Sequence, residues 1–520
     1  MIYNSFKLLC HYNVLLKIIL IITMKYIFKS SLIISVFLVG NNVLFAQNEI
    51  DALRFSQTAP GGTARGIGLA GAMGAVGGDF SALSVNPASI GVYRKSELVI
   101  TPNLKFANVK SNYLNNDEQY TKTKMTISNF GVVFANPAKG QDYESKSWKS
   151  SSFGIGFNRI ADFNQDGLFA GNNSESSMSD VFAVDARLNG TNYNSMPPFG
   201  SFAWNAYLLD NGLNSIPGEI IKNGGSLYQE KYWESKGGIN EWSFTYGGNY
   251  KEQLYLGVSA NVLGYKYDRY TSYLEQDISG NTNNNFESSD FREYLKTTGT
   301  GFNLKIGALY NIADKGKIGA AFHTPTWVYL EDIADYEMYT KTEQLKRTLG
   351  GSDQNPDSYV AINDPLYFEY RLNTPWKATV NAMAFLGKYG FVSADYEYVG
   401  YNNMKYNMGL QYKDFTKAIN NNIQNTFKGG HNIRVGVEGR YEGFLARIGG
   451  AYSSSPYQRK DLYLGDRFDL SIGFGARFGK FFMDIAYINI TQKVGEYGYP
   501  LIASGVPVGI ATVKNNHNAA

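Results

Sequence analysis

The 520-residue chain is poor in several features on which common protein classes depend. It has one Cys, four His and 14 Pro, and only 18% of its residues are charged. Its 48 Lys and Arg nearly balance 45 Asp and Glu, which gives no electrostatic case for a nucleic-acid partner. Past residue 46, no run reaches the ~18 apolar residues of a membrane-spanning helix. A helical membrane protein and a disulfide-stapled scaffold are therefore both excluded.

What the chain has in excess is aromatic residues and glycine. It contains 39 Tyr, 32 Phe and 55 Gly. This mixture is rich in strand formers and poor in strong helix formers. The composition therefore favours a strand-rich fold.

The first 46 residues have the pattern of an export signal. Lys25 and Lys29 precede an apolar run over 32–39, and Ala46 supplies the small residue at the expected cut. We expect residues 1–46 to be a cleaved signal peptide, with translation starting at Met24. The alternative is a retained membrane anchor. Cleavage would remove Cys10, and with it thiol catalysis and Cys-ligated metal.

After the N-terminal region, apolar and polar residues alternate along the chain. From Leu366 to Leu386, the even positions are largely apolar and the odd ones largely polar over about 20 residues. A globular strand averages only about five or six residues. Shorter stretches with the same alternation lie at 256–262, 302–310, 433–438 and 469–478. Since period two places alternate residues on opposite faces of a sheet, we expect long strands with one apolar face.

The connections between these strands differ in length on the two sides. The expected strands cover 97–109, 122–136, 147–161, 239–250, 254–272, 291–312, 317–330, 366–386, 389–402, 431–441, 444–455, 467–478 and 481–493. Tight turns follow most even-numbered strands, and longer loops follow the odd ones: 110–121, 162–238, 273–290, 331–365, 403–430 and 456–466. Short turns on one side and long loops on the other are typical of outer-membrane barrels.

The odd count of thirteen strands requires a fourteenth, expected from about residue 504. The sequence therefore predicts an all-β protein, a 14-stranded antiparallel transmembrane β-barrel over 97–520. A soluble solenoid or propeller would show a fixed repeat of roughly 20–50 residues, and the sequence has none.

Residues 47–96 do not alternate and are rich in glycine. Gly66, Gly68 and Gly71 suggest a phosphate-binding loop, but no strand precedes them and no P-loop Lys follows. The density of small residues suits a compact plug packed against other backbone. We expect this segment to be an N-terminal hatch within the barrel.

The sequence resembles the FadL/TodX family of outer-membrane transport proteins, and its Bacteroidetes members in particular. The most specific feature is Asn86-Pro87-Ala88, within a glycine-rich opening that a strand follows. The hairpin 301–325, Thr374-Pro375-Trp376-Lys377 and the segment 447–452 are also similar to the family pattern. The resemblance covers about residues 50–513.

This resemblance implies passive uptake of hydrophobic compounds, such as long-chain fatty acids, across the outer membrane of a Gram-negative bacterium. The compound would bind in the lumen and leave sideways into membrane lipid through a gap near the third strand. No cofactor, metal or enzymatic activity is implied. Two sets of residues would carry the gating: Arg65, Asp79, Asn86, Pro87 and Ala88 in the hatch, and Gly154, Gly156, Phe157 and Asn158 in a kinked third strand.

The C-terminus departs from the family pattern. Members end on an aromatic residue that the barrel assembly machinery reads, whereas this chain ends in Ala519-Ala520. We therefore expect a truncated last strand and an unpaired edge on the first strand.

A second function is compatible with the same resemblance. Some members in Bacteroidetes are non-transporting components of protein secretion, and their long loops would bind secreted proteins. A continuous apolar tunnel would favour transport, and a fully plugged lumen would favour such a scaffold.

Basic residues on the expected lumen face are candidates for binding a carboxylate head group. They are Lys305, Arg371, Lys377, Arg434, Arg440, Arg447 and Arg477. The alternative is that they pair with inward acidic residues and with the hatch. No Ser or His arrangement indicates a catalytic triad: His323 is expected to face the lumen and His431 to begin a strand.

The long loop 162–238 is expected to lie outside the cell and to contain short helices. One helix would run from Ser179-Asp180 to Arg187 and another over 201–209. The second is apolar on most sides, through Phe202, Trp204, Tyr207 and Leu208. It either receives a hydrophobic ligand or packs on the barrel rim.

Overall fold

A computed structural model describes residues 49–60, 62–187, 198–343, 345, 347–349, 352–354, 358–361, 365–459, 464–499 and 508–519. The predicted signal peptide, 1–46, lies outside these residues. No helix of the described part of the chain is long and apolar enough to cross a membrane.

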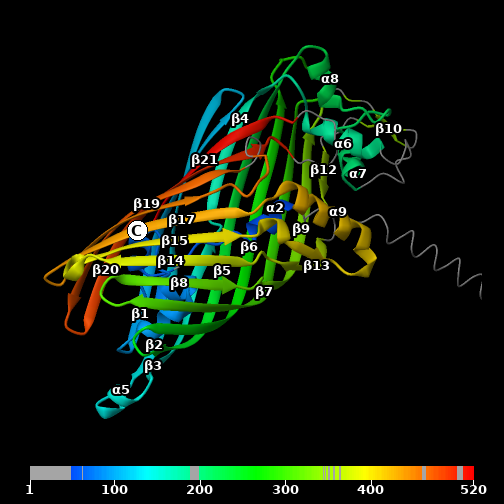
Figure 1. Ribbon diagram of the computed structural model, residues 1–520. Helices are drawn as coiled ribbons and strands as arrows, with labels where there is room; N and C mark the ends of the chain where they lie inside the picture. Colours follow the sequence, from blue (N-terminus) through cyan, green and yellow to red (C-terminus); the bar gives the residue numbers. More distant parts are fainter. Residues whose placement is uncertain are drawn as a thin grey trace, which may run out of the picture.

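The chain forms a closed antiparallel barrel of 14 strands, which confirms the predicted fold class (Figure 1). Three wall strands are each interrupted once, so that two segments share one place in the ring. In order around the wall the segments are β1 Glu97–Tyr113, β2 Asn116–Pro137, β3 Trp148–Asp162, β5 Leu227–Tyr250, β6 Leu254–Asp277, β7 Ser288–Ile312, β8 Gly316–His323 with β9 Trp327–Lys341, β14 Lys377–Phe385 with β13 Leu366–Asn373, β15 Gly390–Val399 with β16 Lys405–Asn407, β17 Gly430–Tyr441, β18 Phe444–Ser453, β19 Leu464–Phe478, β20 Phe481–Tyr497 and β21 Ile510–Ala519.

The last strand, β21, closes the barrel. It begins at Ile510, later than the expected residue 504, and pairs with β20 on one side and with β1 on the other. The pairing with β1 joins Lys105–Asn112 to Thr512–Ala519. The expected unpaired edge is therefore wrong for this part of β1. The pairing satisfies backbone N–H and C=O groups of Lys105–Asn112 that an edge would leave open to lipid. For Glu97–Leu104, the described pairing is with β2 alone, as a truncated last strand predicts.

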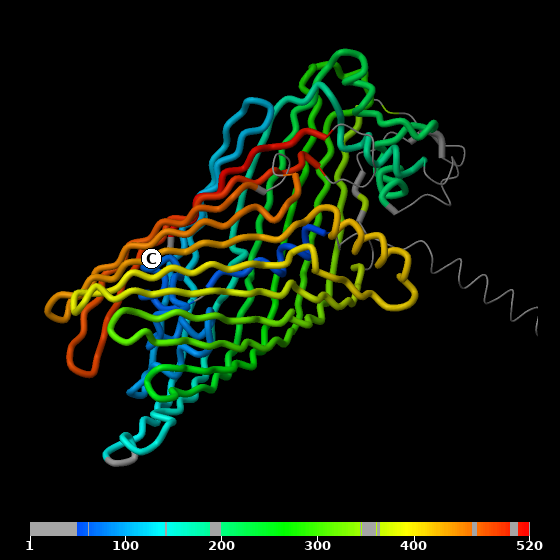
Figure 2. The backbone as a smooth tube through the Cα atoms, in the orientation of Figure 1, coloured from blue at the N-terminus to red at the C-terminus, as the bar shows by residue number. Residues whose placement is uncertain are grey.

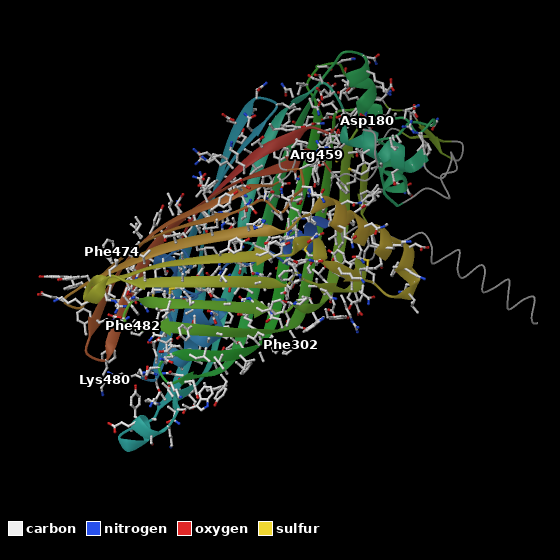
Figure 3. All side chains as sticks on the ribbon, in the orientation of Figure 1. Asp180, Phe302, Arg459, Phe474, Lys480 and Phe482 are labelled. Carbon is white, nitrogen blue, oxygen red and sulfur yellow. The ribbon has the colours of Figure 1, made fainter. Side chains whose placement is uncertain are left out.

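The outer face of the barrel carries the apolar half of the alternation. On β7, Phe302, Ile306 and Tyr310 are 42–57% exposed, and on β19 Leu470 and Phe474 are 69% and 60% exposed. Figure 3 shows Phe302 and Phe474 on the wall, with Lys480 at the turn below. Apolar side chains over roughly 9–11 residues of each strand match the hydrocarbon thickness of a membrane. The protein is thus an outer-membrane β-barrel, with its tight turns on the periplasmic side.

Two short breaks reverse which residues face the lumen. At Thr324-Pro325-Thr326, the inward residues change from odd numbers (His323) to even numbers (Val328), and Thr374-Pro375-Trp376 has the same effect on the next strand. Proline interrupts a ladder because it has no N–H to donate. Arg371 therefore lies on the exposed outer face, and its assignment to the lumen is wrong.

The strands extend further above the membrane than the sequence indicated (Figure 2). The loop expected at 110–121 is instead a hairpin, in which Leu114 and Asn115 take left-handed φ angles of 49° and 64°. Much of 162–238 is also strand: β4, Gln165–Asn173, pairs with the first part of β5. Beyond the membrane, the outward residues of a strand face water and are polar. The sequence of these strand segments therefore lacks the alternation of apolar and polar residues from which a membrane strand is predicted.

Short elements occupy the remaining loops. On the extracellular side are α6 Met178–Arg187, α7 Pro198–Asn205, α8 Ile216–Lys222, α9 Lys413–Thr426, and the strands β10 Arg347–Leu349, β11 Ser352–Gln354 and β12 Ser358–Ala361. The helix α5, Gln141–Ser145, lies at the opposite end of the barrel, in the β2–β3 turn (Figure 1). The helix expected at 201–209 thus ends at Asn205.

Buried polar side chains attach α6 to the barrel wall. Glu275 of β6 accepts hydrogen bonds from the Met178 N–H at 2.8 Å and from the Ser177 hydroxyl at 2.7 Å. Gln229 of β5 donates to Glu275 at 2.7 Å and accepts from the Tyr113 hydroxyl of β1 at 2.7 Å. The extracellular helices are therefore joined to three wall strands.

The N-terminal segment 49–96, hereafter the plug, lies inside the barrel (Figure 1). Its elements are α2 Glu49–Arg54, α3 Ala64–Gly68, α4 Phe80–Val85 and the 3-10 helix η1 Pro87–Val92. Asp79 caps α4 by accepting the Ser81 N–H at 2.9 Å.

Glycine stands in the wall at several places where the plug approaches it closely. A Cβ on Gly257 of β6 would lie 2.3 Å from the Pro87 carbonyl oxygen, and one on Gly156 of β3 would lie 2.2 Å from the Phe80 ring. Gly131, Gly307, Gly436 and Gly449 have similarly close plug neighbours. These positions form a glycine-lined seat for the plug, because any larger residue would push the two apart.

We expect Gly257→Ala to destabilise the protein by about 1–3 kcal/mol, because the new methyl group overlaps plug backbone. Gly264→Ala on the same strand is the matched control, since a Cβ there has no neighbour within 4 Å. Urea unfolding in detergent micelles measures both. Equal stability of the two variants would contradict the glycine seat.

Candidate functional site

The lumen changes from polar to apolar on moving outward along the strands. On β6 the inward residues are Ser259 and Asn261 at plug level and then Leu263, Tyr265 and Tyr267. The other strands contribute further buried apolar residues, Phe291, Leu295, Val328, Leu330 and Tyr336. We call this part of the lumen the upper compartment. A water-filled pore would have a polar interior.

In this conformation protein side chains fill the upper compartment. Phe55, which follows α2 of the plug, is 1% exposed and packs edge-on against Tyr265 and Tyr267 at ring-centroid distances of 6.2 Å. From outside, Phe202 of α7 packs against Phe291 at 6.1 Å. An apolar molecule entering from the extracellular side would have to replace these contacts.

The candidate landing residues of the long loop belong to the same apolar cluster. Phe202 and Leu208 are 8% and 0% exposed, and Trp204 and Tyr207 are partly buried against them. In this conformation they do not form an open surface, which favours the packing interpretation.

A small mixed-charge cavity of about 60 Å³ lies beneath the upper compartment. Its walls include Phe55, Tyr265, Lys305, His323 and Lys377. The Lys305 ammonium pairs with Glu241 at 2.7 and 2.8 Å. The ring of His323 faces the lumen as predicted, with Nε2 3.0 Å from the Val85 carbonyl oxygen of the plug. The cavity thus joins plug backbone to charged wall residues.

Lys377 is the cavity cation without a carboxylate partner. Its ammonium donates to the Thr58 hydroxyl of the plug, and no Asp or Glu of the described chain lies within ion-pair distance. The nearby Glu397 is already paired with Arg434 at 2.8 Å. An anionic group entering the cavity from the apolar side would meet this ammonium.

The remaining head-group candidates have other roles. Arg434 and Arg447 are buried and paired with acidic residues, as the alternative interpretation expected. Arg440 and Arg477 lie near the periplasmic ends of their strands, where Arg440 is half-exposed and Arg477 is exposed. Together with Arg371 on the outer face, these positions leave Lys377 as the basic residue best placed for a ligand.

Arg65 fastens the plug to the wall. Its guanidinium donates to both carboxylate oxygens of Glu438 on β17, at 2.7 and 3.1 Å. Arg447 binds the same Glu438 at 2.8 Å and Asp484 at 2.6 Å. We call these four residues the Arg65 latch. The bidentate geometry fixes the plug in one position.

The Asn86-Pro87-Ala88 motif forms a second attachment. The Asn86 side chain accepts the Ala88 N–H at 3.1 Å and donates to carbonyl oxygens of Ala308 and Ala320 at 3.3 and 3.4 Å. It also donates to Asn381 at 3.2 Å. Pro87 begins η1, where the absence of an N–H costs nothing. Asn86 thus caps a plug helix and crosslinks it to three wall strands.

The third strand is intact in this conformation. Residues 150–158 of β3 pair with both β2 and β5. Gly154 and Gly156 face Ile90 and Phe80 of the plug, so their present role is to seat the plug. Phe157 points outward, and the Asn158 side chain donates to the Ser84 hydroxyl at 3.0 Å.

Comparison with known proteins gives the fold an independent match. A Pseudomonas aeruginosa FadL homologue aligns over 89% of this chain and 98% of its own, with 14% identity and a TM-score of 0.50. This chain has a FadL-like fold. The Pseudomonas putida toluene transporter TodX aligns over 87% and 96%, with 12% identity and a TM-score of 0.48. No family model and no curated protein matches the sequence.

Two residues of the site in this FadL-like barrel, Phe55 and Glu241, were not predicted from the sequence. Phe55 lies in a segment without periodicity, so nothing marks it as the residue that fills the upper compartment. Glu241 lies on an expected strand, but its partner Lys305 is 64 residues away. Strand alternation gives the face of a residue and not its height relative to other strands.

We expect Glu438→Ala to destabilise the docked plug by about 3–5 kcal/mol, because it leaves Arg65 and Arg447 buried without their shared carboxylate. Trypsin cleavage after Arg65 in the detergent-solubilised protein measures plug release. Arg440→Ala is the control: Arg440 also binds Glu438, but its side chain is 50% exposed. Cleavage of E438A no faster than that of R440A would rule out the latch.

Proposed function

We propose that the protein takes up hydrophobic compounds with an anionic end, such as long-chain fatty acids, passively across the outer membrane. The observation that carries this proposal is the apolar upper compartment, which ends at the Lys377 ammonium. Within the described part of the chain, this ammonium is bound by the Thr58 hydroxyl and has no carboxylate partner. An apolar chain gains free energy by leaving water for such a compartment. A carboxylate gains a charge-assisted contact at its base.

The plug provides the gate in this proposal. A ligand that enters the upper compartment competes with Phe55 for Tyr265 and Tyr267, and its head group competes with Thr58 for Lys377. Both displaced residues belong to the plug. Ligand binding therefore favours a plug position in which the Arg65 latch opens. Release of Phe80 from Gly131 and Gly156 would then free β3 for lateral exit into lipid.

The alternative, a secretion component that binds other proteins, has one observation in its favour. Side chains of the plug and of α7 fill the lumen in this conformation, as a non-transporting scaffold would require. Capture of secreted proteins by the extracellular loops, together with no uptake, would support this role.

A reversible crosslink tests transport through plug movement. The Ser84 hydroxyl of the plug accepts a hydrogen bond from the Asn158 side chain of β3 at 3.0 Å, and the chain has only one Cys. We expect S84C/N158C, joined through a short bifunctional methanethiosulfonate, to form a reducible disulfide bridge that stops uptake of radiolabelled oleate. The assay uses a Gram-negative host that lacks its own fatty-acid channel.

Reduction of this disulfide bridge should restore uptake. The control is Y441C/F444C, a pair that faces across the β17–β18 hairpin away from the plug. Uptake by the crosslinked plug variant equal to that of the control would show that the plug does not gate. No uptake by the unmodified protein would overturn the transport function itself.

A further inference from the structure

The last wall strand, β21, ends short of the periplasmic ends of its two neighbours. Ala519 of β21 lies opposite Lys105 of β1 and Ile488 of β20. Closer to the periplasm, within the described part of the chain, Glu97–Leu104 of β1 pairs with β2 alone, and Phe481–Tyr487 of β20 pairs with β19 alone. Two strand edges therefore face each other across a space in the wall, which we call the strand slot.

The strand slot lies at the level of the membrane. The outward residues of both edges are apolar: Leu98 and Ile100 of β1 are 65% and 63% exposed, and Met483 and Ile485 of β20 are 70% and 65% exposed. Hydrocarbon offers no hydrogen-bond partner to the backbone N–H and C=O groups of these edges. An occupant that brings its own backbone groups is therefore favoured over lipid chains.

The width of the slot selects one extended segment. At its upper end, β21 separates β1 from β20 by two strand spacings of about 4.8 Å each. A helix is about 10–12 Å across and has already paired its own backbone groups. A single strand over the length of Phe481–Tyr487 fits this space and can form ladders with both edges.

The plug closes the inner side of the slot. Its helix α3 lies against β19 and β20, and Asp484 of β20 belongs to the Arg65 latch. At the other edge, the Tyr93 hydroxyl of the plug donates to Glu97 of β1 at 3.3 Å. An occupant thus has lipid on its outer face and the plug on its inner face. Apolar residues at alternate positions, with small residues between them, meet both requirements.

We propose that the strand slot binds the extended N-terminal segment of another polypeptide by β-strand addition. The strand pairs on either side, β1–β2 and β19–β20, are antiparallel, as are the pairs of β21 with β1 and β20. The occupant runs antiparallel to both edges in the same way. Its N-terminal end lies beside Ala519, and its chain continues toward the periplasm. This binding is independent of the uptake function.

A peptide with the sequence of Ser471–Phe478 is a suitable probe. This part of β19 has Ile472 and Phe474 on the outer face and Gly473 and Gly475 on the inner face. It therefore has the alternation that the slot requires. For disulfide trapping, the probe carries Cys at its second position, which replaces an outward residue.

Trapping in lipid bicelles tests both binding and register. A probe that continues the register of β21 from the position after Ala520 has its second residue opposite Ile485 of β20. We expect Ile485→Cys to trap the probe about tenfold or more faster than Ile306→Cys. Ile306 on β7 is the matched control, because it is also an outward isoleucine, exposed to 57% against 65% for Ile485.

Two further changes separate strand pairing from adsorption. A probe with Pro in place of both glycines cannot donate the same ladder hydrogen bonds, and we expect it to lose the preference for I485C. I485C extended beyond Ala520 by the sequence of Ser471–Phe478 should fill its own slot and also lose the preference.

Equal trapping of the original probe by I485C and I306C would overturn the proposal, because the edges would then bind no strand. A preference retained by the Pro probe or by the extended protein would also overturn it. Disulfide-linked dimers of I485C that form in place of the probe adduct would assign the slot to a second copy of this chain and contradict a separate partner.

Discussion

The rest of the structure depends on the close contact between plug and wall. A plug can fill a 14-stranded barrel at this depth because glycine stands where its backbone and side chains meet the wall, as at Gly156, Gly257 and Gly307. A single methyl group at these positions would occupy space that the plug already holds. The contact leaves little room in the lower lumen, so an incoming compound has only the upper compartment to enter.

Charge then determines where the plug sits within this seat. The Arg65 latch is almost completely buried. Buried ion pairs add little net stability, because desolvation offsets their attraction, but losing one partner is costly. The latch therefore fixes a position without making the plug permanent. Lys377 and Phe55 lie where plug, apolar wall and cavity meet, so a ligand there acts on the same element that the latch holds.

Much of the wall could be predicted from the sequence, because lipid imposes alternation on each strand. The tight turns at 251–253, 442–443 and 479–480 gave the topology, and glycine density indicated a plug. The prediction that Arg371 faces the lumen was wrong because the break at Thr374–Trp376 changes which alternate residues point inward. The alternation of apolar and polar residues does not reveal such a break. The expected loop at 110–121 was wrong because strands above the membrane face water on their outer side.

The site was harder to predict than the fold. Gly154 and Gly156 stood out in the sequence, yet the sequence does not distinguish a glycine that permits a kink from one that makes room for Phe80. The pairing of Lys305 with Glu241 and of Arg434 with Glu397 depends on the stagger of strands around the ring, which sets the height of each residue. That stagger pairs Lys305, Arg434 and Arg447 with acidic residues and leaves Lys377 without a carboxylate partner among the described residues.

Photolabelling with a diazirine-bearing long-chain fatty acid, followed by peptide mapping, tests the central claim most directly. The account predicts labels on inward residues of the upper compartment, Leu263, Phe291 and Leu330, and a marked loss of these labels in Lys377→Gln. Labels confined to the outward residues Phe302 and Ile306, with or without Lys377, would show that the compound meets only the lipid face and would contradict uptake through the lumen.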